Sequence, residues 1–112
     1  MLSSSERYEM LKITLKECCN DLLKKTDEEI NYYLFEVIPI DINSYLHKNT
    51  LNILLNEGMI DSLIYSKCIE LRNYFNENID PIKKTSHKDI KNATTVKTFA
   101  RMADYIIELL YL

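Results

Sequence analysis

The chain has 112 residues, of which 46% are hydrophobic, and its formal net charge at pH 7 is −3. This length and apolar content suffice for one buried core without metal or disulfide staples. A single glycine and two prolines leave too few turn residues for a multi-stranded β fold. We therefore expect one all-α domain over residues 1–112, a compact bundle of about five helices.

The sequence predicts neither a secretion signal nor a membrane segment. Its N-terminal stretch is charged and amphipathic, unlike a signal peptide, and no apolar run approaches the roughly 18 residues of a membrane span. The three cysteines, Cys18, Cys19 and Cys68, are odd in number and lie within predicted helices. This pattern is typical of buried, reduced thiols, so we expect a cytoplasmic protein without disulfides.

The first predicted helix runs from about residue 4 to residue 25. Ser3 and Glu6 have the spacing of a capping box, in which each side chain binds the other's backbone amide. The apolar residues that follow recur in steps of three and four, at Tyr8, Leu11, Leu15, Cys18 and Leu22. These steps place them on one face of a helix, which we expect to face the core.

A second helix is predicted over residues 27–37. Thr26 and Glu29 repeat the capping-box spacing, and Pro39 is expected to end the helix. The segment 30–38 is rich in β-branched and aromatic residues, so a strand is an alternative there. We prefer the helix because no second strand is available to pair with it.

The third helix is predicted to end at Gly58, the only glycine of the chain. Residues 39–42 are expected to be a linker, with Asn43 capping a helix that reaches about Glu57. Its expected inward residues are Leu46, Thr50, Ile53 and Leu54. The turn at Gly58 then leads into the next helix, which makes this hairpin the centre of the predicted bundle.

The fourth helix is predicted from its cap Asp61 to about residue 76, with a break at Pro81. Its apolar residues lie within about 40° of one another at 100° per residue, namely Ile64, Cys68, Leu71 and Phe75. After a short turn over residues 86–91, Thr94 or Thr95 is expected to open the last helix. Its predicted inward stripe is Val96, Phe99, Ala103, Ile106 and Leu110, flanked by Ala100 and Ile107.

Charge is distributed unevenly along the chain. Residues 27–80 carry ten acidic and three basic side chains, a net charge of −7. Such a segment disfavours nucleic acid as the main partner and favours a basic protein. The alternative is a solvated face plus acids at helix starts. The residues that we predict to bind the partner are Asp27, Glu28, Glu36, Glu57, Asp61, Glu70, Asn73, Glu77 and Tyr105.

The C-terminal segment has the opposite charge. Residues 81–112 carry six basic and three acidic side chains, and all six basic residues lie between Lys83 and Arg101. This stretch supports an alternative function in which the protein is a nucleic-acid-linked regulator. A further alternative is a structural homodimer, formed by an apolar face between Tyr32 and Ile38.

The sequence contains no recognisable catalytic or metal-binding constellation. His47 and His87 are far apart, and neither pairs with a cysteine at ligand spacing. One glycine cannot build a phosphate-binding loop. We therefore expect a protein that is not an enzyme and that uses no cofactor and no metal.

Two stretches resemble known families. The segment Leu71-Arg72-Asn73-Tyr74-Phe75 resembles the Arg-Asn start of the R-x(4 to 6)-H signature of HEPN-type ribonucleases. That resemblance implies a helical nuclease that pairs Arg72 with a histidine. The positions where the histidine would fall, residues 77–79, are Glu, Asn and Ile, so half of the catalytic pair is missing and the implied nuclease is a degenerate one.

The second resemblance covers about 25 residues around Gly58, from Leu54-Leu55-Asn56-Glu57 to Leu71-Arg72. In size and in its helix-Gly-helix pattern the chain is similar to small all-helical bacterial immunity proteins. That resemblance implies a non-catalytic inhibitor that covers the active site of a basic, nuclease-like toxin. Together with the acidic middle segment, it gives the function that we expect.

Overall fold

The computed structural model describes residues 2–86 and 88–112, and within them every regular element is helical. The six α-helices are α1 (Ser4–Cys18), α2 (Asp27–Tyr32), α3 (Ile38–Tyr45), α4 (Lys48–Asn56), α5 (Ser62–Lys83) and α6 (Thr94–Leu110). A π-helical turn, Tyr33–Val37, joins α2 to α3 without a break, so the described residues form five helical segments. The predicted all-α bundle is confirmed, and the strand alternative for residues 30–38 is wrong.

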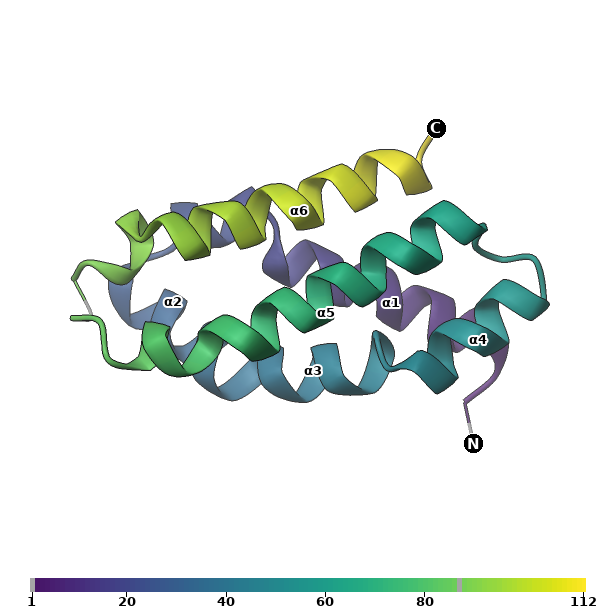
Figure 1. The fold of residues 1–112 in the computed structure, drawn as a ribbon, viewed down its shortest axis with the longest axis horizontal. Coiled ribbons are helices and arrows are strands. Elements are labelled where there is room, and N and C mark those ends of the chain that lie inside the picture. The colour runs from purple at the N-terminus through teal and green to yellow at the C-terminus, as the bar shows by residue number, and fades with distance from the viewer. Residues whose placement is uncertain (1, 87) are drawn as a thin grey trace.

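The helices form an elongated bundle that measures 42 × 29 × 22 Å (Figure 1). The two longest helices, α5 and α6, lie side by side and antiparallel, while α1 packs against α6, α3 and α4. The α4–α5 turn lies at one end of the long axis, and α2 lies near the other end. One continuous set of buried apolar side chains runs between these helices.

The inward stripes predicted for the last two long helices are confirmed, except that Leu110 at the end of α6 is only partly buried. All four predicted α5 residues are buried: Ile64, Cys68, Leu71 and Phe75. On α6 the buried residues are Val96, Phe99, Ala100, Ala103 and Ile106. Phe75 and Phe99 meet between the two helices with ring centroids 5.3 Å apart. Ala100 and Ala103 are fully buried, which is consistent with the close approach of α6 to its neighbours.

Three predicted helix caps are present. Ser3 and Glu6 form a complete capping box, with N–O distances of 3.0 and 3.1 Å, and Thr26 and Glu29 form a second one. The Asp61 carboxylate accepts the backbone N–H of Ile64 at 2.8 Å. Each cap satisfies backbone amides that the first turn of a helix leaves unpaired. These three helix N-termini could therefore be predicted from the sequence.

The first helix ends earlier than predicted. It stops at Cys18, Cys19 is extended, and residues 20–24 form a short 3₁₀ turn. Leu22 is nevertheless fully buried, so the predicted apolar face continues across the break. The change of direction brings the Asn20 amide to the side chain of Asp104 on α6, a contact between residues 84 positions apart.

Pro39 does not end the second helix, which corrects the prediction of a linker over residues 39–42. In an α-helix the proline ring would clash with the carbonyl of Phe35, four residues before it, and would leave that carbonyl without a donor. The π-helical turn lies immediately before the proline, and its Ile38 N–H binds the carbonyl of Tyr33, five residues back. This wider turn relieves the clash, so Pro39 lies in the first turn of α3.

Asn43 is not a helix cap, and the predicted third helix is divided in two. Asn43 lies within α3, and its amide group forms reciprocal hydrogen bonds of 3.0 and 3.3 Å with Asn76 of α5. The cap of α4 is His47, whose Nδ1 accepts the Asn49 N–H at 3.1 Å. Within α4 the buried residues are Leu51 and Leu54, whereas Ile53, which we expected to face inward, is only partly buried.

The fourth helix is longer than predicted, because it passes through Pro81 and ends at Lys83. Pro81 lies in the last turn on the exposed side, and the next residue, Ile82, is 5% exposed and packs into the core. Burial of Ile82 accounts for the extra turn. The predicted turn over residues 86–91 includes His87, which lies outside the described residues; a 3₁₀ turn follows at Ile90–Asn92.

The turn at Gly58 is confirmed in detail. The Met59 N–H binds the Leu54 carbonyl at 2.9 Å and the Gly58 N–H binds the Leu55 carbonyl at 3.0 Å, which is the Schellman pattern. Gly58 has a φ angle of +73°, which side chains other than glycine adopt at a cost. This turn ends α4 and orients the chain for the Asp61 cap of α5.

We expect Gly58→Ala to destabilise the protein by about 1–2 kcal/mol, measured by urea unfolding. A Cβ atom at Gly58 would meet no atom within 4 Å, so the cost comes from the backbone alone. Gly58→Asn is the matched control and should recover part of the loss, since asparagine tolerates this conformation better. An alanine variant as stable as the parent would contradict this account of the turn.

Candidate protein-binding surface

The outer side of α6 is the most distinctive polar surface of the bundle. Opposite its buried stripe, four exposed residues follow one another in steps of four, four and three: Lys97, Arg101, Tyr105 and Glu108. Lys97 lies in the first turn of α6 and Glu108 in the last. Both charges oppose the helix dipole, which favours acids at the start and bases at the end. Helix stability therefore does not explain these two residues.

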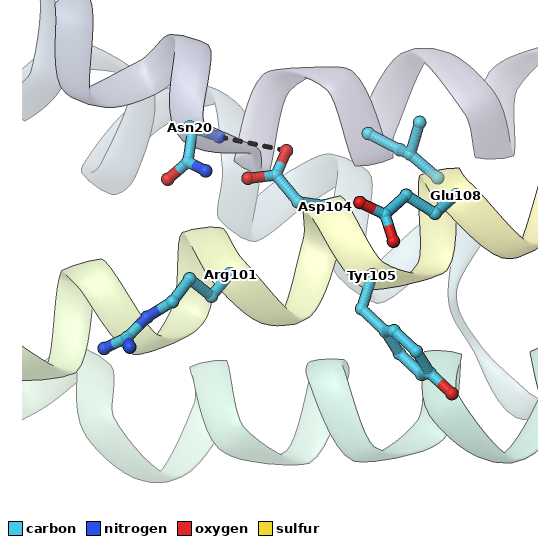
Figure 2. A pocket seen from close by; sticks show the side chains of 6 residues that line it. Asn20, Arg101, Asp104, Tyr105 and Glu108 are labelled. Carbon is cyan, nitrogen blue, oxygen red and sulfur yellow. Dashed lines mark hydrogen bonds between the residues drawn. The ribbon is translucent and has the colours of Figure 1, made fainter.

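An open depression of about 600 Å³ lies along this outer side of α6 (Figure 2). Its lining residues are Asn20, Arg101, Asp104, Tyr105, Ile107 and Glu108. Asp104 and Glu108 point to the side where α1 and the following turn lie, and the Tyr105 ring extends toward α5. The depression therefore combines two carboxylates, an aromatic ring and one arginine on neighbouring turns of one helix.

One carboxylate oxygen of Asp104 has no hydrogen-bond partner among the described residues. Its Oδ1 accepts the backbone N–H of Asn20 at 3.4 Å, a long bond that fixes the carboxylate toward the 3₁₀ turn. Its Oδ2 is shielded from solvent and meets no hydrogen-bond donor among the described residues. A shielded carboxylate oxygen without a donor is unfavourable, so Asp104 is not placed here to stabilise the fold.

Tyr105 connects the depression to α5. Its side chain is 45% exposed, and the Lys67 Nζ of α5 lies 5.8 Å from its ring centroid. Lys67 also forms an ion pair with Glu70, one helical turn away, at 3.3 Å. Because Lys67 lies near both Glu70 and Tyr105, it connects the exposed sides of α5 and α6. The surface therefore extends over both helices.

Further along α5, the exposed residues Asn73 and Glu77 continue the surface from Glu70. Because the helices are antiparallel, the contacts Lys67–Tyr105 and Phe75–Phe99 fix their register. This register sets Glu77 at about the level of Lys97. We use the name α5–α6 surface for six exposed residues and the partly buried Asp104 beside them. The exposed residues are Glu70, Asn73, Glu77, Arg101, Tyr105 and Glu108.

All nine residues predicted to bind a partner are exposed, but they do not form one surface. Glu70, Asn73, Glu77 and Tyr105 belong to the α5–α6 surface. Glu57 and Asp61 flank the α4–α5 turn, and the Asp61 carboxylate is already used as a helix cap. The remaining three residues lie on the α2 segment and the π-helical turn, toward the opposite end of the bundle: Asp27, Glu28 and Glu36.

The acids of α2 also have basic neighbours. The 3₁₀ turn Ile90–Asn92 packs against α2, so Lys91 lies at the same end of the bundle as Asp27 and Glu28. These acids occupy the first turn of α2, where they complement the helix dipole. Their positions are explained by local structure, in contrast to Asp104 and Glu108.

Sequence reasoning did not select Asn20, Asp104 and Glu108, and it assigned Arg101 only to the basic stretch. The spacing of Arg101, Asp104 and Glu108 on the polar side of the last helix, with an acid in its last turn, was a usable signal. The position of Asn20 had no such signal, because it depends on the break at Cys19.

The residues of the alternative functions lie elsewhere. Arg72 of α5 is partly buried, and its Nε meets no hydrogen-bond partner in the described part of the chain. His47, one of the two histidines of the chain, caps α4. Within residues 2–86 and 88–112, no group of three or more His, Cys, Asp or Glu side chains is arranged to hold a metal ion.

Comparison of the chain with protein-family models, curated proteins and solved structures found no match. None of the described helices is long and apolar enough to cross a membrane. The functional argument therefore rests on the α5–α6 surface itself.

The three cysteines are buried and free. Burial raises the pKa of all three thiols above the usual value of 9, and raises that of Cys68 to about 12. Since the reactive thiolate falls about tenfold for each pKa unit, buried thiols of this kind are inert. This arrangement suits side chains that pack as small apolar groups.

We expect all three cysteines to react with a thiol reagent at least ~100-fold more slowly in the folded protein than in urea. A Ser66→Cys variant provides the control, because Ser66 is exposed on α5 and its thiol should react at once. A native cysteine that reacts as fast as the introduced one would contradict the burial described here.

Proposed function

We propose that this protein is a non-catalytic inhibitor of the immunity-protein kind, which neutralises a basic, nuclease-like toxin by covering its active site with the α5–α6 surface. The observation that carries the proposal is the open depression beside Tyr105, whose lining includes the carboxylates of Asp104 and Glu108. A lysine or arginine side chain of the partner supplies the charge that complements these carboxylates.

The other lining groups suit cationic side chains of the same partner. Glu108 adds a second carboxylate one turn beyond Asp104, and the face of Tyr105 offers a cation–π contact. Tyr105 already has Lys67 near its ring, so a partner cation would exchange with a contact that the free protein makes itself. Partly exposed tyrosines of this kind are frequent anchors at protein interfaces.

Net charge supports the approach of such a partner. The segment 27–80 carries a net charge of −7, and an acidic field accelerates the encounter with a basic protein. Arg101 at the edge of the depression adds selectivity, because it favours a partner that presents an acid or a polar group at that position. The proposal thus assigns affinity to Asp104, Glu108 and Tyr105, and orientation to Arg101.

Co-expression of the protein with a basic toxin nuclease tests the proposal through host survival and the dissociation constant of the complex. We expect Glu70→Lys/Glu108→Lys to weaken binding at least ~100-fold and to abolish protection. The control is Glu36→Lys/Glu57→Lys, which changes net charge equally at exposed positions outside the α5–α6 surface and should retain protection.

Equal losses in both variants would show that only net charge matters and would refute the assigned surface.

The basic stretch supports a second candidate function, since Lys83, Lys84, Lys88 and Lys97 are all exposed. Salt-sensitive RNA binding that is lost in Lys83→Glu/Lys84→Glu, without inhibition of any toxin nuclease, would favour that nucleic-acid role.

A further inference from the structure

Two carboxyl groups meet where α1 packs against α3. Glu17 lies in the last turn of α1 and Asp41 in the first turn of α3, which packs against α1. The Asp41 side chain lies beside the Glu17 carboxyl. Both side chains are partly shielded from solvent.

The protonation state of this pair decides whether it attracts or repels. The Glu17 Oε2 is shielded from solvent and has no hydrogen-bond donor among the described residues. Two ionised carboxylates can only accept hydrogen bonds, so neighbouring carboxylates repel each other. One proton between them turns one carboxyl into a donor and gives the shielded oxygen a bonded neighbour.

No lysine forms an ion pair with Glu17 that could neutralise its charge in place of the proton, among the described residues. The charged and titratable groups around Glu17 are Lys16, Cys18, Asp21, Lys25 and Tyr33, in addition to Asp41. The Lys25 Nζ lies over the Tyr33 ring at 4.7 Å from its centroid, and the Lys16 Nζ lies 5.9 Å from the Tyr111 centroid. Neither lysine forms an ion pair with Glu17 within 4 Å in the described structure.

We propose that Glu17 and Asp41 share one proton at neutral pH and form a pH-sensitive clasp between α1 and α3. Burial, followed by the hydrogen bond to Asp41 and its charge, raises the pKa of Glu17 from 4.5 to about 8. The folded chain therefore binds this proton more tightly than the unfolded chain. The stabilisation is complete below about pH 4.5 and is lost as the pH rises through about 8.

The clasp is independent of the proposed toxin inhibition, because neither carboxyl belongs to the α5–α6 surface. Above the pKa of Glu17 the two carboxylates repel, which loosens the contact of α1 with α3. At lower pH the shared proton restores that contact. The pair thereby makes the packing of the N-terminal helix respond to pH within the range that cells experience.

A carboxyl titration of the intact protein by ¹³C NMR tests the clasp directly. We expect Glu17 to titrate near pH 8 in the parent and at a clearly lower pH in Asp41→Asn, where the partner carries no charge. A parent Glu17 that titrates near 4.5 would overturn the proposal, and this outcome does not depend on the folding of any variant.

Urea unfolding at pH 5 and pH 9 gives the second readout. The unfolding equilibrium constant of the parent should rise at least ~10-fold more between these pH values than that of Glu17→Gln, whose amide donates to Asp41 at either pH. Glu28→Gln, at an exposed position on α2, is the matched control and should keep the parental pH dependence. Identical pH dependence in the parent and Glu17→Gln would also overturn the clasp.

Discussion

The packing of α5 against α6 is the constraint on which the rest of this structure depends. Phe75 and Phe99 meet between the helices, and the buried Ala103 leaves room for close packing on α6. Burial of a large aromatic side chain is worth several kcal/mol, so this contact holds the two longest helices in a fixed register. The remaining helices cover the inner sides of this pair.

The same register determines what the pair presents to solvent. With the apolar stripes turned inward, Glu70 of α5 and Tyr105 of α6 become neighbours through Lys67. The 3₁₀ turn after α1 then positions the Asn20 amide against Asp104. The proposed binding surface is thus a consequence of core packing, because its residues come from two helices that only the fold brings together.

Local signals in the sequence were sufficient for much of the fold. The caps at Ser3, Thr26 and Asp61, the turn at Gly58 and the periodic stripe from Val96 are all short-range features that act within a few residues. The elements that they define agree with the structure. The all-α class followed from the same features, together with the shortage of turn residues.

The errors have a different origin, since each depends on contacts between distant residues. The sequence predicts helix ends at Pro39 and Pro81. The π-helical turn relieves the steric clash of Pro39, and the burial of Ile82 outweighs the cost of Pro81 within α5. The break after Cys18 was also not visible from sequence. Because that break creates the contact between Asn20 and Asp104, the candidate site could be predicted only in part.

Native-state hydrogen exchange tests the central role of α5 and α6 most directly. The account predicts that the slowest amides lie around Phe75 and Phe99, and that they exchange only through global unfolding. Amides of α2 and α4, which are shorter helices near the ends of the bundle, should exchange through smaller openings. If amides around Phe75 and Phe99 exchanged as fast as those of α4, the α5–α6 pair would not be the frame of this protein.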